Sequence, residues 1–248
     1  MPEPNPELFQ TIKQRLEKIR ANIAVAAQKC NRSASEVLLL AVSKRQPLGV
    51  IEAAYVCGLR SFGENYAEEA HEKIEQLAYL NDIRWEMVGH VQSRKSVSVA
   101  ADFTRVHSLD SLKLARKLNV ARAAHGIKEP LEVLLQLNVS GEASKEGMPA
   151  WDKDQWQNLP PIVSEILTLG QLRLTGLMTM PPLFEEPELS RPFFGLLRQA
   201  RDYLNQQIPG LALTELSMGT SSDYPVAVEE GATIIRIGTA LLGPRIYQ

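Results

Sequence analysis

Apolar residues recur every three or four positions near the start of the chain. This spacing places them on one side of an α-helix and leaves the other side polar. We therefore predict an amphipathic helix over Pro6 to Gln28, packed against either the side or the bottom of the remaining fold. The repeated residues are Leu8, Ile12, Leu16, Ile19, Ile23 and Ala27.

A different pattern follows this helix. Residues Val37 to Val42 are all apolar, and the run ends at Ser43 and Lys44. A short, uninterrupted apolar run is typical of a strand buried on both faces of a parallel sheet. Seven further short runs predict strands at Arg60 to Phe62, Trp85 to Val88, Arg105 to His107, Leu131 to Leu137, Arg173 to Leu177, Leu213 to Ser217 and Thr233 to Ile237.

Helical patterns separate the predicted strands. Alternating strands and helices favour parallel β/α units joined by right-handed crossovers, and eight such units predict a closed barrel. The predicted fold class is therefore α/β, a single (β/α)8 TIM barrel with an additional N-terminal helix. An open doubly wound sheet is the alternative, but it would need a glycine-rich turn where this chain has Lys44 to Pro47. Predicted helices include Tyr66 to Leu80, Ser111 to Ala124, Gln155 to Leu169 and Pro192 to Gln207.

Composition narrows the kind of protein. No linker or charge block divides the chain, so we expect one domain over residues 1–248. With 44% hydrophobic and 23% charged residues, the composition is that of a soluble globular protein. A net charge of −2 offers no general attraction for nucleic acid or an anionic membrane. The absence of a signal-peptide pattern, a membrane-length apolar run or a cysteine metal motif predicts a cytoplasmic protein without a metal site.

Lys44 stands where the first predicted strand ends. In a barrel, the carboxyl ends of all strands meet on one face, where functional residues gather. Desolvation there lowers the pKa of an amine and makes the amine more nucleophilic toward an aldehyde. The alternative is a lysine that simply extends from the strand into solvent.

Small and hydroxyl residues follow the last two predicted strands. Ser217 to Asp223 follows the seventh strand, and Arg236 to Thr239 follows the eighth. Loops at these positions commonly bind phosphate in such barrels, although glycine and serine also predominate in ordinary turns. Together with Lys44, the loops are consistent with a phosphate ligand that reacts with an amine. They are also consistent with a sugar phosphate bound without covalent chemistry.

Seven ordered blocks carry a resemblance to a known family. Over nearly its whole length, the chain resembles the YggS/PROSC family of pyridoxal-phosphate-binding homeostasis proteins. That family is similar to the N-terminal barrel of alanine racemases, which are fold type III pyridoxal-phosphate enzymes. The blocks are Leu39 to Lys44, Phe62 to Tyr66, Trp85 to Gln92, Val106 to Asp110, Gly176 to Met178, Leu216 to Gly219 and Arg236 to Thr239.

The resemblance implies cofactor contacts at matching positions. Lys44 matches the lysine that forms a Schiff base with pyridoxal 5′-phosphate. Ser221, Gly238 and Thr239 match the phosphate ligands, and Ser217 is a further candidate for cofactor binding.

The resemblance also implies contacts with the cofactor ring. Asn65 would approach the ring or its hydroxyl, and Arg236 would face the pyridine nitrogen. His90 and Met218 are candidates for lining the pocket or for packing at its rim. An arginine opposite the ring nitrogen opposes its protonation, which makes the ring a weaker electron sink.

These features predict a protein that binds pyridoxal phosphate in vitamin B6 and amino-acid homeostasis without efficient catalysis. Alanine racemases bring a tyrosine from another domain as a second acid or base, and we expect this chain to lack that domain. The alternative is a small racemase or decarboxylase that uses His90 or Tyr66 as the second base. The expected partners are the cofactor and pyridoxal-phosphate-dependent apoenzymes, and the expected state is a monomer.

Overall fold

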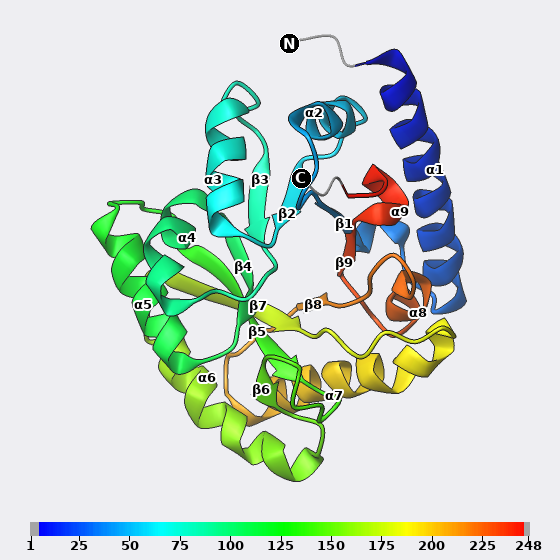
Figure 1. The fold of residues 1–248 in the computed structure, drawn as a ribbon. Coiled ribbons are helices and arrows are strands. Elements are labelled where there is room, and N and C mark those ends of the chain that lie inside the picture. The colour runs from blue at the N-terminus through cyan, green and yellow to red at the C-terminus, as the bar shows by residue number, and fades with distance from the viewer. Residues whose placement is uncertain (1–4, 246–248) are drawn as a thin grey trace.

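A computed structural model describes residues 5–245 of the chain (Figure 1). Within this range, eight parallel strands close into a barrel. Strand β1 pairs with both β2 and β9, and β4 pairs with both β3 and β5, so no edge is left open. The predicted closed barrel is confirmed. Its strands are β1 (Leu38–Val42), β2 (Ser61–Glu64), β3 (Arg84–Met87), β4 (Arg105–Leu109), β5 (Leu131–Asn138), β7 (Leu172–Met178), β8 (Glu215–Ser217) and β9 (Ile234–Ile237).

Helices surround the barrel (Figure 1). The α-helices are α1 (Pro6–Lys29), α2 (Leu48–Val56), α3 (Ala67–Gln76), α4 (Ser96–Asp102), α5 (Leu112–Ala124), α6 (Leu159–Leu167), α7 (Arg191–Gln207), α8 (Tyr224–Glu229) and α9 (Thr239–Leu242). Short 3₁₀ segments are η1 (Ala34–Glu36), η2 (Ser93–Lys95), η3 (Lys153–Asn158) and η4 (Pro187–Ser190). None of the helices in the described range is long and apolar enough to cross a membrane.

The predicted N-terminal helix is confirmed as α1, and it lies on the side of the barrel. Its start is fixed by Asn5, whose side-chain oxygen accepts hydrogen bonds from the backbone N–H groups of Glu7 and Leu8. The helix packs against α2, α8 and α9, beside the last strands (Figure 1). The predicted stripe provides most of the residues that it buries: Ile12, Leu16, Ile19, Ile23, Ala26 and Ala27.

The segment between β5 and β7 differs from the prediction in two ways. A two-residue strand, β6 (Met148–Pro149), pairs with the end of β5 in a segment where the sequence predicted no strand. The predicted helix of residues 155–169 begins as η3 and becomes α-helical only at Leu159. Pro160 and Pro161 occupy the first turn of α6, where their missing N–H groups would have no helical partner in any case.

Polar side chains occupy part of the barrel interior. His107 on β4 and Ser217 on β8 are fully buried, and their side chains lie 2.8 Å apart. Because β4 and β8 are not neighbours in the sheet, this contact crosses the inside of the barrel. An apolar cluster of Leu40, Leu134, Met178 and Ile234 forms a separate part of the core.

Candidate functional site

A cavity of about 320 Å³ opens where the barrel strands end. Its size lies at the lower limit of pockets that bind small molecules. Six of the seven residues predicted to contact a cofactor line it, whereas Ser217 lies buried beneath. The lining residues are Val42, Lys44, Asn65, Val88, Met180, Leu183, Thr220, Ser221, Ser222, Arg236, Gly238, Thr239 and Arg245.

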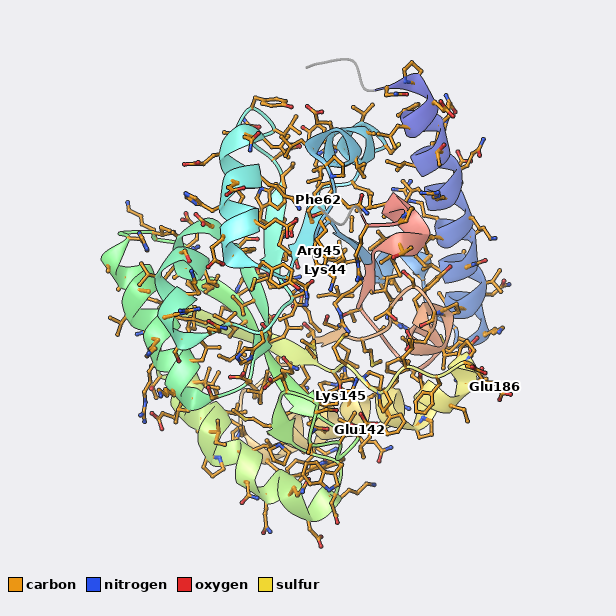
Figure 2. All side chains as sticks on the ribbon, in the orientation of Figure 1. Lys44, Arg45, Phe62, Glu142, Lys145 and Glu186 are labelled. Carbon is orange, nitrogen blue, oxygen red and sulfur yellow. The ribbon has the colours of Figure 1, made fainter. Side chains whose placement is uncertain are left out.

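Lys44 reaches this cavity from the end of β1. Figure 2 shows Lys44 and Arg45 near the middle of the ring of strands. The side chain of Lys44 is half-buried, and burial lowers the pKa of its amine below the ordinary value. The positive charges of Arg245 and Arg45 lower this pKa further. Because the neutral form of an amine attacks an aldehyde, these surroundings favour covalent chemistry at Lys44.

A buried ion network fixes the backbone just before Lys44. The Nζ atom of Lys73 on α3 donates hydrogen bonds of 2.7 Å to the carbonyl of Ser43 and to carboxylate oxygens of Glu64 and Glu69. The hydroxyl of Ser43 donates to the same Glu64 oxygen at 2.8 Å. The network therefore holds the ends of β1 and β2 and the start of α3 together beside the amine of Lys44.

Asn65 follows β2 and presents an unsatisfied group. Its Oδ1 atom is buried and has no hydrogen-bond partner within residues 5–245. An unpartnered buried acceptor is costly, and a ligand hydroxyl in the cavity would satisfy it. The backbone of Asn65 packs directly against Gly89. A Cβ atom on residue 89 would lie only 2.3 Å from the Asn65 carbonyl oxygen, so this close approach requires glycine.

Arg236 on β9 lies at the floor of the cavity. Its Nη1 donates to the Ser217 hydroxyl at 2.6 Å, and its Nη2 donates to the Thr179 carbonyl at 2.9 Å. Its Nε–H has no protein partner in the described part of the chain, so this donor is left for a ligand. Burial lowers the pKa of Arg236 to about 10, so the guanidinium still carries its charge near neutral pH.

The loops after β8 and β9 meet at the cavity. The backbone N–H of Ala240, in the first turn of α9, donates to the Ser221 hydroxyl at 3.4 Å. Helix α8 begins at Tyr224, directly after Asp223. Asp223 does not cap this helix with its side chain, which instead accepts hydrogen bonds from the backbone N–H and the hydroxyl of Thr220 at 2.6 and 3.0 Å.

Other candidates lie away from the cavity. Met218 is fully buried in the hydrophobic core. His90 is exposed, and its Nδ1 atom lies 3.1 Å from a carboxylate oxygen of Asp110. Tyr66 is 46% exposed. None of these three lines the cavity.

The sequence did not indicate several lining residues. Arg245 follows α9, outside any strand end, and nothing in its local pattern distinguishes it from a surface arginine. Met180 and Leu183 form an apolar wall after β7 and are 44% and 80% exposed. Their exposure next to a cavity is visible only in three dimensions.

Comparison with known proteins places these features in a family context. The model of the alanine racemase N-terminal domain matches residues 14–245. The pyridoxal phosphate homeostasis protein of Pseudomonas aeruginosa is 44% identical over 239 residues, which is 96% of this chain and 98% of that protein. The protein of the same name from Escherichia coli K12 is 38% identical and covers 94% of this chain and 96% of its own length.

Solved structures show the same fold. PipY of Synechococcus elongatus PCC7942, solved with pyridoxal phosphate bound, is 35% identical, with a TM-score of 0.80 over 94% of this chain and 100% of its own. The alanine racemase of Clostridium difficile 630 is 14% identical, with a TM-score of 0.68. This chain covers 56% of the racemase, and at that identity the likeness concerns the fold alone.

Proposed function

This chain belongs to the family of pyridoxal phosphate homeostasis proteins, and we propose from that membership that it binds pyridoxal 5′-phosphate as a Schiff base on Lys44. We propose that it serves vitamin B6 and amino-acid homeostasis. The observation that carries the proposal is one cavity that contains an amine of lowered pKa together with the loops after β8 and β9.

The residues of the cavity fit this cofactor. When bound, pyridoxal phosphate supplies an aldehyde that condenses with an amine and a ring that accepts electrons. Lys44 would hold the aldehyde carbon. Asn65 offers its unpartnered acceptor to the ring hydroxyl, and Arg236 offers its Nε–H to the ring nitrogen.

The phosphate would lie in the loops after β8 and β9. Ser221 and Thr239 contribute hydroxyl groups there, and Gly238 lets the ligand approach the backbone closely. Arg245 adds a positive charge at the same cavity. We do not assign Ser217 to the phosphate, because its hydroxyl already contacts Arg236 and His107.

We propose further that the protein holds the cofactor without rapid amino-acid turnover. Proton transfer at a substrate carbon needs an acid or base within hydrogen-bonding reach on each side. Among residues 5–245, the cavity lining contains no histidine, tyrosine, aspartate or glutamate. This favours a carrier over the competing racemase or decarboxylase, for which His90 or Tyr66 would have to reach the cavity.

The cellular setting is also a proposal. We propose a monomeric, single-domain protein of the cytoplasm that supplies the cofactor to apoenzymes. Cys30 and Cys57 are both free, as is usual for thiols in a reducing compartment.

The test is an absorption spectrum of the purified protein with pyridoxal phosphate, before and after borohydride reduction, followed by peptide mapping. We expect a visible band that reduction removes, with the label on Lys44. Lys44→Ala should lose the band but keep part of the phosphate affinity, whereas Lys117→Ala, at an exposed position on α5, should behave as wild type.

Two other results would change the assignment. A colourless protein that is nevertheless stabilised by phosphate would indicate a sugar-phosphate site without covalent chemistry. Racemisation or decarboxylation of amino acids at about 1 to 1000 turnovers per second would refute the carrier hypothesis.

A further inference from the structure

A chain of hydrogen bonds leads from the cavity into the barrel. Arg236 Nη1 lies 2.6 Å from Ser217 Oγ, which lies 2.8 Å from His107 Nδ1. His107 Nε2 lies 2.8 Å from Glu86 Oε2. The four residues come from β9, β8, β4 and β3, and each is at most 5% exposed. A buried, continuous polar chain of this kind connects groups that lie far apart in the sequence.

The direction of every hydrogen bond in this chain is determined. A guanidinium can only donate, so the Ser217 oxygen accepts from Arg236 and its own proton is free for His107. The ionised Glu86 carboxylate can only accept, so His107 Nε2 donates to it, and the Nδ1 atom of the neutral ring accepts from Ser217. Burial lowers the pKa of His107 and keeps the imidazole neutral, in agreement with this tautomer.

Arg105 holds Glu86, at the inner end of this series of hydrogen bonds. Arg105 Nη1 lies 3.4 Å from the same Glu86 oxygen. Arg105 in turn donates to Glu132 at 2.7 Å and to Glu215 at 2.8 Å. The other oxygen of Glu86 has no partner within residues 5–245, so His107 and Arg105 carry all of the hydrogen bonding of this carboxylate. Glu86 therefore fixes the position of the His107 ring.

We propose that His107 and Glu86 are positioning residues that act through Ser217 to hold Arg236 with its Nε–H directed at the ligand. This inference rests on the proposed function. With Ser217 and Thr179 fixing both terminal nitrogens, the guanidinium cannot turn. A pyridine nitrogen bound in this cavity would face a fixed N–H donor, which would disfavour protonation of that nitrogen.

The alternative is that these groups serve stability alone. A buried series of polar side chains stabilises a core poorly, because well-packed apolar residues of similar volume are often more stabilising. This series of hydrogen bonds ends on Arg236 at the floor of the cavity, where the orientation of the guanidinium would matter for the ring. A role in positioning therefore accounts for its location, which a role in packing does not.

Two amide substitutions at His107 separate the two hydrogen bonds of its ring. His107→Asn places an amide oxygen near the position of Nδ1, which keeps an acceptor for Ser217 but loses the donor to Glu86. His107→Gln reaches the position of Nε2, which keeps the donor to Glu86 but loses the acceptor for Ser217. Ser217→Ala also removes the hydrogen bond between residue 217 and His107, and it does so by deleting a single oxygen atom. This variant therefore tests that hydrogen bond even if the larger substitutions at His107 unfold the protein.

The experiment measures the affinity for pyridoxal phosphate and the pH dependence of its visible band in each variant. We expect His107→Gln and Ser217→Ala to bind about tenfold more weakly, the loss expected for one hydrogen bond to a charged group. In both variants the pH titration of the band should shift in the same direction, and His107→Asn should shift less. The control is Arg122→Met, which removes a buried charge from α5, outside the barrel interior.

Each contrary result is decisive. Wild-type affinity and pH titration in both His107→Gln and Ser217→Ala would overturn the inference while leaving the proposed function intact. An equal spectral change in Arg122→Met would reduce the effect to loosened packing. Wild-type protein that takes up no cofactor would refute the proposed function, and this inference with it.

Discussion

The amine of Lys44 differs from that of an exposed lysine because of where β1 ends. Burial is the largest cause of its lowered pKa, followed by the charges of Arg245 and Arg45. Since the charged form is disfavoured, the neutral fraction of Lys44 at a given pH exceeds that of a lysine with the ordinary pKa of about 10.4. Attachment of an aldehyde should therefore strengthen as pH rises, with a midpoint below that of a free lysine.

Arg245→Gln tests the electrostatic part of this effect. Removing a positive charge makes protonation of Lys44 easier, so the pKa of the amine should rise. The midpoint pH for pyridoxal phosphate attachment, measured by borohydride trapping and mass spectrometry, should then move upward. Arg94→Gln, at an exposed position away from the cavity, should leave the midpoint unchanged. An unchanged or lower midpoint in Arg245→Gln would show that this charge does not act on Lys44.

Gly89→Ala tests the packing behind Asn65. The added methyl group would meet the Asn65 backbone at 2.3 to 2.8 Å, so the loop that carries this side chain must move. We expect a loss of about 1–3 kcal/mol in the free energy of unfolding, as for other overpacked sites, together with weaker cofactor binding.

Gly170→Ala is the matched control, because nothing lies within 4 Å of a Cβ atom added there. Thermal unfolding and a binding titration of both variants make the comparison. If Gly89→Ala were as stable as Gly170→Ala and bound the cofactor as tightly, Asn65 would not need its present position.

At the scale of elements, the helix α1 offers the clearest test of packing. Ile12 is fully buried against the side of the barrel, whereas Val25 on the same helix is 57% exposed. Ile12→Ala should cost about 2–5 kcal/mol through lost burial and the cavity it leaves. Val25→Ala should change the free energy of unfolding by about 0.5 kcal/mol or less. Denaturant titrations measure both, and equal effects would mean that α1 is not docked as described.

The sequence predicted the elements well for a physical reason. A strand covered by other residues must be apolar along most of its length, so it is readable from a short apolar run such as Leu38–Val42, of which Leu40 and Ala41 are fully buried. The strand β6 has only two residues, and the helix before β7 begins as η3, so neither leaves a periodic pattern long enough to read. The position of Lys44 followed directly from the end of a strand.

At the scale of the whole molecule, contacts between distant strands were beyond sequence reasoning. Glu86, His107 and Ser217 each lie in a segment that reads simply as a strand. Only closure of the barrel brings their side chains together across its interior. The same holds for Lys73, whose helix α3 reads as an ordinary amphipathic surface helix although its amine is buried.

The buried pair of His107 and Glu86 predicts how stability depends on pH. Burial lowers the pKa of His107, so the unfolded chain binds this proton more readily than the folded barrel does. The contribution of His107 to the free energy of unfolding should therefore be fully present above the unfolded pKa of about 6.5. It should be lost as the pH falls from there through the lower pKa of the folded state. Burial alone would raise the pKa of Glu86, but His107 and Arg105 lower it overall, which adds a further loss at more acid pH.

Thermal unfolding between about pH 7.5 and 5.5 measures this dependence around the ordinary histidine pKa. Each kcal/mol lost should lower the Tm by about 2–4 °C for a chain of this size. His107→Gln cannot titrate there and should show a shallower fall, whereas His125→Gln, at an exposed position, should follow wild type. A variant at residue 107 with the wild-type pH slope would show that another group governs acid unfolding.

The docking of α1 against α2, α8 and α9 has a consequence for how the protein is made. Helix α1 leaves the ribosome well before α8 and α9, so the apolar stripe of the first helix lacks these two packing partners until they have been synthesised. The strands β8 and β9 and their loops emerge together with these two helices. A nascent chain can therefore cover its first helix, close its barrel and complete the cavity only after the segment from β8 to α9 has left the ribosome.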